Sequence, residues 1–358
     1  MSDSIENNKK YRIASLDGSD FEAANRFKQA QPKKDLDINA LVSEILQQKT
    51  GALSKAITIT ESERSDHQRI SEHLIEKCLP YSGVSLRIGI TGVPGVGKST
   101  FIEALGNVLV KQGKRVAILA VDPSSIISKG SILGDKTRMA SLVQNSEVFI
   151  RPSPAKNNPG GVAEKTREAI ILCEAAGYDT ILVETVGIGQ NEIAVHEIVD
   201  FFLLLKLPGA GDDLQAIKRG IIEMADMIVI NKADGDLLVH AEKAQQIFSQ
   251  TLHASAHHHS AKKPDVLLCS ALKQEGLHEI LSSILNEHKE NKTSGFFEEK
   301  RRKQRRYWFT QTIEEQLKSN FYKHPDIQKN LQTYLDAIEE NQLTPFAAAR
   351  SLLNMLEH

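Results

Sequence analysis

The chain has 358 residues, of which 41% are hydrophobic and 25% are charged, an ordinary balance for a globular protein. Its formal net charge of −2 argues against nucleic-acid binding, because nucleic-acid-binding domains usually carry a large basic excess. The apolar run at residues 201–205 is broken at Lys206, and no run reaches the ~20 residues that cross a bilayer. The amino terminus is polar, and Cys78, Cys173 and Cys269 stand far apart, so we expect a cytoplasmic protein with buried, reduced thiols and no membrane partner.

Four segments follow one another along the sequence. Residues 1–37 are polar, and residues 38–80 form an N-terminal helical extension, in which apolar residues such as Ile38, Leu41 and Ile45 recur at helical spacing. A further helix is predicted from Asp66 to Leu79. Residues 81–291 alternate between strands and helices. Residues 292–358 contain no strand pattern and predict two or three amphipathic helices, which we expect to form a dimerisation arm.

Seven strands are predicted in the alternating segment, at residues 86–91, 115–122, 147–152, 180–186, 201–207, 227–233 and 265–271. They are apolar on both faces, which is typical of a parallel sheet covered by helices on each side. The predicted fold class is α/β, with a doubly wound, mostly parallel sheet and helical extensions at both ends.

The first strand leads into a glycine-rich loop, and residues 92–99 match the P-loop pattern G-x-x-x-x-G-K-S between a strand and a helix. Glycines let several backbone N–H groups surround a phosphate chain at the start of a helix. Lys98 adds a charge for the β- and γ-phosphates, and Ser99 is placed to hold Mg²⁺. We expect a nucleoside triphosphate to be bound by Gly92, Val93, Pro94, Gly95, Val96, Gly97, Lys98, Ser99 and Thr100.

The preferred base is indicated by Asn231, Lys232 and Asp234, which follow the apolar strand at 227–230 with the N-K-x-D spacing of GTPases. The Asp234 carboxylate can accept hydrogen bonds from N1–H and the exocyclic amine of guanine, and adenine offers neither donor. A second loop after the strand at 266–268 matches the weaker S-A-x element. This loop consists of Ser270, Ala271 and Leu272. GTP and GDP are therefore the expected nucleotides.

Two carboxylates end strands beside the P-loop, where a doubly wound sheet binds its ligand. These are Asp122 and Glu184, and Mg²⁺ prefers such carboxylates together with phosphate and water. Glu184-x-x-Gly187 resembles the D-x-x-G element of GTPases, in which the glycine N–H can contact a γ-phosphate. The charged loop at 130–139 is a candidate for ordering by the γ-phosphate and Mg²⁺. A helix N-cap or surface carboxylate is the alternative for either acid, and a plain surface loop for 130–139.

A further group of motifs makes a family resemblance specific. In order, VDPSS, GSILGDKTRM, RPSP, GGVAEKTREA, VETVGIGQNE, LPGAGDDLQAIKRGIIEMAD and NKAD resemble the MeaB/ArgK family, from about residue 38 to the end of the chain. The resemblance implies a homodimeric GTPase that protects, gates or reloads an adenosylcobalamin-dependent acyl-CoA mutase of the methylmalonyl-CoA mutase type. It also implies that residues 208–218 are an additional switch and that Mg²⁺ is held near Ser99, Asp122, Asp135 and Glu184.

The chain departs from the family pattern at 128–130, where T-G-G is usual, and at 155–159, where a Gly/Ser-rich stretch is usual. Both departures lie in loops that we expect to move, so they affect the expected partner specificity more than the expected nucleotide binding.

No group that would position the attacking water is evident. In Ras-like enzymes a Gln directly follows the D-x-x-G glycine, whereas Ile188 follows Gly187 here and Gln190 stands two positions further on. We therefore expect slow GTP hydrolysis that rises when a mutase orders the loops carrying Asp135 and Lys218. The residues expected to act in catalysis are Lys98, Asp135, Glu184 and Lys218.

Other functions stay open at this point. The His257–His259 cluster could indicate a metallochaperone GTPase for metal-centre assembly, although its Ala/Ser/Lys-rich setting favours a solvated loop. A non-catalytic nucleotide-sensing module is a third possibility. The basic run at 300–306 is interpreted as a solvated helix face, because acidic residues precede it. Trp308 and Phe309 are interpreted as dimer or core contacts.

Overall fold

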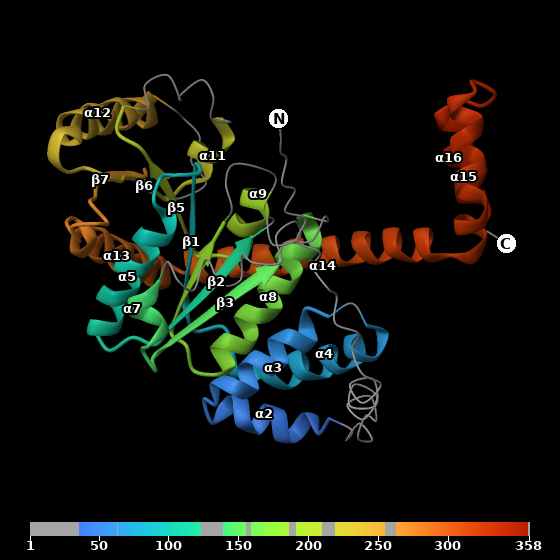
Figure 1. Cartoon of the computed structure of the whole chain (residues 1–358), viewed down its shortest axis with the longest axis horizontal. Helices are drawn as coiled ribbons and strands as arrows, with labels where there is room; N and C mark the ends of the chain where they lie inside the picture. The colour runs from blue at the N-terminus through green and yellow to red at the C-terminus, as the bar shows by residue number, and fades with distance from the viewer. Residues whose placement is uncertain are drawn as a thin grey trace, which may run out of the picture. The chain divides into compact units, whose positions relative to one another are not determined.

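The computed structural model describes residues 36–62, 64–122, 139–154, 159–185, 191–209, 219–254 and 263–356. Within them, seven strands form one sheet in the order β3-β2-β4-β1-β5-β6-β7, and all neighbouring strands are parallel (Figure 1). The strands are β1 (Leu86–Gly92), β2 (Val116–Asp122), β3 (Val148–Pro154), β4 (Thr180–Glu184), β5 (Phe201–Lys206), β6 (Met227–Ile230) and β7 (Asp265–Leu268). Because β1 lies between β4 and β5, the chain crosses over to both sides of it, as in a doubly wound sheet. The predicted fold class and the seven predicted strands are confirmed.

Helices connect the strands and cover both faces of the sheet (Figure 1). They are α5 (Lys98–Lys111), α7 (Ala140–Val143), α8 (Pro159–Ala175), α9 (Asn191–His196), α11 (Arg219–Met224), η3 (Gly235–Leu237), α12 (Leu238–Ala254) and α13 (Leu277–Ser294). On one face, Ile88 and Ile90 of β1 lie in a core shared with buried residues of α5 and α13. On the other face, α8 contacts β2 and α9 contacts β1. The strands are apolar on both sides because both sides are covered.

Three helices and a 3-10 turn precede the sheet, in the segment predicted to be helical. They are α2 (Ile38–Leu46), α3 (Thr50–Thr60), α4 (Ser65–Cys78) and η1 (Leu79–Tyr81). Gln48 has a φ of 63°, a backbone conformation that non-glycine residues seldom adopt, and it separates α2 from α3. All three helices contact α8, so the extension forms a further layer outside that helix.

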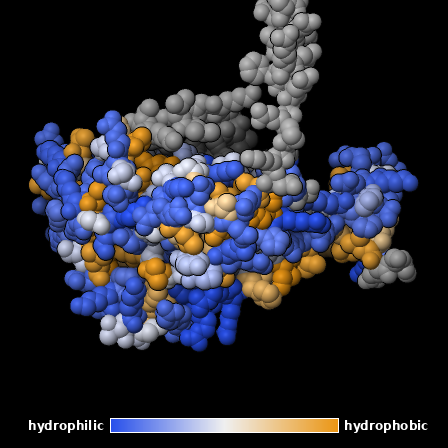
Figure 2. Space-filling model, turned by 90° about the horizontal axis from the view of Figure 1, so that it is seen from below, coloured by the Kyte–Doolittle hydropathy of each residue, from blue (hydrophilic) through white to orange (hydrophobic). Residues whose placement is uncertain are grey.

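Three helices follow α13, as predicted: α14 (Phe296–Lys323), α15 (Pro325–Glu339) and α16 (Pro345–Asn354). In the first half of α14 the buried residues are Phe297, Arg301, Gln304 and Trp308. At the end of this half Phe309 is 71% exposed, and in the second half Leu317 is 63% exposed. Hydrophobic residues are interspersed with hydrophilic ones on the face drawn in Figure 2, including along these helices. No helix in the described ranges is long and apolar enough to span a bilayer.

A buried network of charges attaches α14 to the sheet. Arg301 donates to the Asp200 carboxylate through Nε at 2.5 Å and through Nη2 at 2.6 Å. Arg87 of β1 donates to both carboxylate oxygens of Glu174 in α8, each at 2.9 Å. The prediction of a solvated face is therefore wrong for Arg301, which is 5% exposed, and for the part-buried Lys300, which donates to the Asp200 carbonyl oxygen at 2.7 Å. This part of the basic run packs against acidic residues that lie far away in the sequence, so it is not a solvated face.

The cysteines are confirmed as buried free thiols. Burial raises the pKa of Cys78 to about 11 and that of Cys269 to about 12. Thiols with such pKa values stay protonated at neutral pH, and a protonated thiol is a poor nucleophile and metal ligand.

Replacing Glu174 by Gln should destabilise the fold strongly, because it leaves the Arg87 guanidinium without its carboxylate partner in a buried site. Burial, and then repulsion from Arg301, already lower the pKa of Arg87, and Glu174 opposes both effects. Breaking a buried ion pair from one side costs about 3–5 kcal/mol, which urea unfolding would measure.

The matched control is Glu147→Gln, since Glu147 pairs with Arg115 at 3.0 Å but its side chain is 50% exposed. This substitution should cost less than about 1 kcal/mol. Equal losses for the two variants would show that burial does not govern the strength of the network.

Candidate functional site

The carboxyl ends of the central strands meet at one edge of the sheet, and the predicted P-loop lies there. β1 ends at Gly92, and α5 begins at Lys98. Gly97 has a φ of 93°, and a Cβ atom at this position would lie 2.8 Å from the Asn231 side-chain nitrogen. Glycine is therefore required for the backbone conformation and for the close approach of the 231–234 segment.

Lys98 and Ser99 begin the helix with their polar groups turned to neighbours around the loop. The Lys98 ammonium donates to the Gly92 carbonyl oxygen at 2.8 Å and to that of Val93 at 3.4 Å. Burial lowers the pKa of Lys98, while the charges of Glu184 and Glu192 oppose the shift. Ser99 Oγ donates to Glu184 Oε1 at 3.2 Å. The structure thus brings together a hydroxyl and a carboxylate that sequence analysis assigns to one metal ion.

Asn231 joins the P-loop to the two loops on the base side. Its Nδ2 donates to the Val96 carbonyl oxygen at 2.8 Å, and its Oδ1 accepts from the Ala271 N–H at 3.1 Å. The side chain is 2% exposed, so both ends of the amide are satisfied in a buried position. This one side chain fixes the distance between a phosphate-type loop and a base-type loop.

The Asp234 carboxylate lies next to the second base-side loop. Its Oδ2 accepts a hydrogen bond from Ser270 Oγ. Ser270 Oγ also accepts from the Lys273 N–H at 3.2 Å, which holds the hydroxyl in one orientation. Lys232 is exposed with a φ of 61°, and Leu272 is 82% exposed. The N-K-x-D and S-A-x elements are therefore adjacent in space, as their functions require.

Three buried polar residues near the phosphate loop are not among the site residues predicted from the sequence. Thr185 Oγ1 donates to Thr91 Oγ1 at 2.8 Å, which ties the end of β4 to the end of β1. Glu192, in the first turn of α9, is 1% exposed and acts electrostatically on Lys98. The available signal was an acidic residue just after Gly187, but nothing in the sequence distinguished it from an ordinary helix-starting carboxylate.

Several predicted residues cannot be placed in this geometry. Asp135, Gly187 and Lys218 lie outside the described residues, as does the His257–His259 cluster. Asp122 ends β2, but its side chain is outside the described part. Within the described ranges, no group of three or more His, Cys, Asp and Glu residues is arranged to hold a metal ion. The Ser99 hydroxyl and Glu184 carboxylate are hard oxygen donors, so they suit Mg²⁺ bound jointly with phosphate.

Comparisons with known proteins find similar proteins over most of the chain. The family described as "Methylmalonyl Co-A mutase-associated GTPase MeaB" matches residues 53–326. The chain is 40% identical to "GTPase ArgK" of Escherichia coli (strain K12) over 316 residues, covering 88% of this chain and 96% of that one. It is 39% identical to "Methylmalonic aciduria type A homolog, mitochondrial" of Mus musculus, covering 90% of this chain and 80% of that one.

A solved structure of similar fold is described as "Crystal structure of LAO/AO transport system kinase". It aligns with a TM-score of 0.72 and 34% sequence identity, covering 91% of this chain and 99% of that chain. The P-loop, the base-side loops and the matches over most of the chain lead to one conclusion: this protein belongs to the family of methylmalonyl-CoA mutase-associated GTPases MeaB.

Proposed function

We propose that this GTPase is a chaperone of an adenosylcobalamin-dependent acyl-CoA mutase of the methylmalonyl-CoA mutase type, which it protects, gates or reloads. The observation that carries the proposal is the match of the MeaB family, whose description names association with that mutase, to residues 53–326. That range contains the predicted nucleotide loops and the 208–218 segment. A cytoplasmic location stays a prediction.

In this proposal GTP lies across the edge of the sheet between the P-loop and the base-side loops. Asp234 reads the guanine, and Asn231 sets the spacing between the loops through Val96 and Ala271. Leu272 and Lys232 are both exposed and would cover the two sides of the base. The support is that the side-chain hydrogen bonds of Asn231 and Asp234 to these loops join residues of the predicted motifs.

Mg²⁺ would be held by Ser99 and Glu184 together with Asp122 and Asp135, and when bound it neutralises charge on the phosphate oxygens. Lys98 contributes a second positive charge, and its N–H donors already converge on the P-loop carbonyls. Because the ammonium is partly buried, its interaction with phosphate is screened less than at a free surface. Asp135 and Lys218 are proposed to complete the catalytic site when the mutase binds.

The direct test is affinity purification of the full chain from its source cell, once with GDP and once with a non-hydrolysable GTP analogue. We expect a cobalamin-dependent mutase to be retained, and to different extents in the two nucleotide states. Absence of any such mutase under both conditions would contradict the chaperone proposal.

Asp234→Asn should lower GTP affinity by about 10²-fold or more, because two hydrogen bonds to a charged acceptor are lost. The same variant should favour xanthosine triphosphate, since the Asn amide can donate to the xanthine 2-oxo group. Calorimetry with GTP, ATP and xanthosine triphosphate measures both effects. Asp236→Asn, an exposed residue two positions along, is the matched control and should bind as the parent does. ATP binding as tight as GTP binding would exclude base reading by Asp234.

Lys218→Ala should leave GTP affinity nearly unchanged but reduce the mutase-stimulated rate of hydrolysis by about 10²-fold, the usual effect of removing one group that stabilises transition-state charge. Steady-state phosphate release with and without the mutase separates these effects. A parent protein that hydrolyses GTP at the stimulated rate when alone would rule out this gating.

The exposed apolar side of the second half of α14 supports dimerisation through the C-terminal helices. Ile313 is 43% exposed and Leu317 is 63% exposed, one helical turn apart. The double variant Ile313→Glu/Leu317→Glu should run as a monomer in light scattering and still bind GTP. Lys318→Glu, at an exposed neighbouring position, is the control. A double variant that stays dimeric would place the interface elsewhere.

A further inference from the structure

One face of α14 binds the turn that joins α9 to β5. Trp308 Nε1 donates to the Glu197 carbonyl oxygen at 2.9 Å, and Gln304 Nε2 donates to that of Val199 at 2.8 Å. Lys300 Nζ donates to the Asp200 carbonyl oxygen at 2.7 Å. Because residues four apart lie on the same side of a helix, these three side chains form one row along α14. The row bonds main-chain atoms, so it fixes the path of the turn.

A charged contact locks the same turn to β1. The Asp200 carboxylate accepts from Arg301 and also, through Oδ2, from the Arg87 main-chain N–H at 2.9 Å. Asp200 is 8% exposed and Arg301 is 5% exposed. Charge-assisted hydrogen bonds in a buried site are directional and strong, so α14, the turn and β1 cannot move independently.

α9 itself packs on β1, the strand that ends at the phosphate loop. Glu192, in the first turn of α9, is 1% exposed, and its charge opposes the lowering of the Lys98 pKa. Gly89 lets α9 lie close to β1, since a Cβ atom there would be 3.2 Å from a Val195 methyl group and 2.9 Å from the Phe202 ring. This six-residue helix therefore lies between the strand that leads into the P-loop and the turn bonded by the row of side chains on α14.

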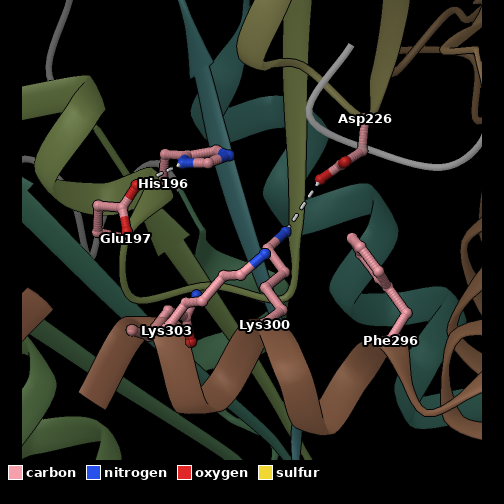
Figure 3. Close-up of a pocket in the computed structure, with 7 residues that line it drawn as sticks. His196, Glu197, Asp226, Phe296, Lys300 and Lys303 are labelled. Atoms are coloured by element: carbon pink, nitrogen blue, oxygen red, sulfur yellow. Dashed lines mark hydrogen bonds and ion pairs between the residues drawn. The ribbon is translucent and has the colours of Figure 1, made fainter. Parts of the chain in front are cut away.

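Hydrogen bonds join α14 to the turn, but side chains do not fill all of the space beside this contact. A pocket of about 150 Å³ lies beside it, lined by His196, Glu197, Asp226, Phe296, Lys300, Lys303 and Gln304. In Figure 3, Lys300 extends from α14 to Asp226, a separation of 3.6 Å, while His196 and Glu197 lie on the other side of the pocket. Hydrogen bonds and the Asp200 ion pair, rather than continuous packing, therefore hold α14 to this turn.

We propose that α14 positions α9 against β1 through the turn at 197–200, and that this contact couples the bound nucleotide to the C-terminal helices. A shift of α9 by an ångström or two would break hydrogen bonds of 2.7–2.9 Å unless α14 moved with it. The coupling is reciprocal, so weakening the contact must change the relative affinities of GTP and GDP. The inference rests on the proposed placement of GTP phosphates at Lys98, and it needs no mutase.

The test uses the full-length double variant Gln304→Leu/Trp308→Phe, which removes two donors and keeps most of the side-chain volume. Calorimetry gives the dissociation constants for GDP and for a non-hydrolysable GTP analogue. We expect their ratio to change by about five-fold or more, the lower range of allosteric coupling. Arg305→Ala, an exposed position on the same turn of α14, should leave the ratio unchanged. A general loss of stability would lower both affinities together and leave the ratio intact.

Hydrogen exchange on the unaltered protein gives a second measurement that does not depend on the variant folding. Amides of residues 191–206 and 296–310 should change protection together when GDP is replaced by the GTP analogue. A ratio within two-fold of the parent in a folded double variant would overturn the proposal. Hydrogen exchange that changes near the P-loop but not at residues 296–310 would also overturn the proposal. Neither result bears on whether a mutase is the partner, so the two proposals can fail separately.

Discussion

Because all seven strands run parallel, the two ends of the sheet have different chemistry, and the rest of the structure follows from this division. At the carboxyl ends lie the P-loop, Glu184 and the 231–234 segment. At the amino ends, Asp200 and Asp226 each stand one residue before a strand, β5 and β6, and each accepts a main-chain N–H from a neighbouring strand residue. The first end provides N–H groups and oxygen ligands for nucleotide, and the second provides carboxylates for the basic residues of α14.

The charges at the amino ends specify where α14 lies more than they stabilise the fold. Removing charges from water is costly, and a buried pair often does no better than a hydrophobic pair of equal volume. Arg301 meets this cost with bonds to Asp200 and to the Ser85 carbonyl oxygen, and its guanidinium lies 4.8 Å from the centre of the Phe297 ring. A planar guanidinium can satisfy these partners together, whereas a lysine offers a single point charge. Only one placement of α14 satisfies the whole set.

The strands, the order of the helices and the contacts of the nucleotide loops follow from local sequence, because each depends on a pattern a few residues long. Asn231 and Asp234 are examples, since the strand before them determines where they emerge. The partners of Arg301 could not be predicted in this way. Asp200 lies 101 positions away, and no local pattern in a basic run indicates which residue turns inward. The role of Glu192 could not be predicted for the same reason, because it depends on the charge of Lys98, which is distant in the sequence.

The length of α14 connects the amino-terminal end of the sheet with the C-terminal helices. It is one helix of 28 residues whose first half bonds the α9–β5 turn and whose second half carries exposed apolar side chains. Residues 309–323 extend about 22 Å at the rise of an α-helix. A tilt of about 10° at the turn would therefore displace the far end by about 4 Å, which exceeds the tolerance of a packed interface. A small change at α9 is thus enlarged by a straight helix, without any rearrangement of the sheet.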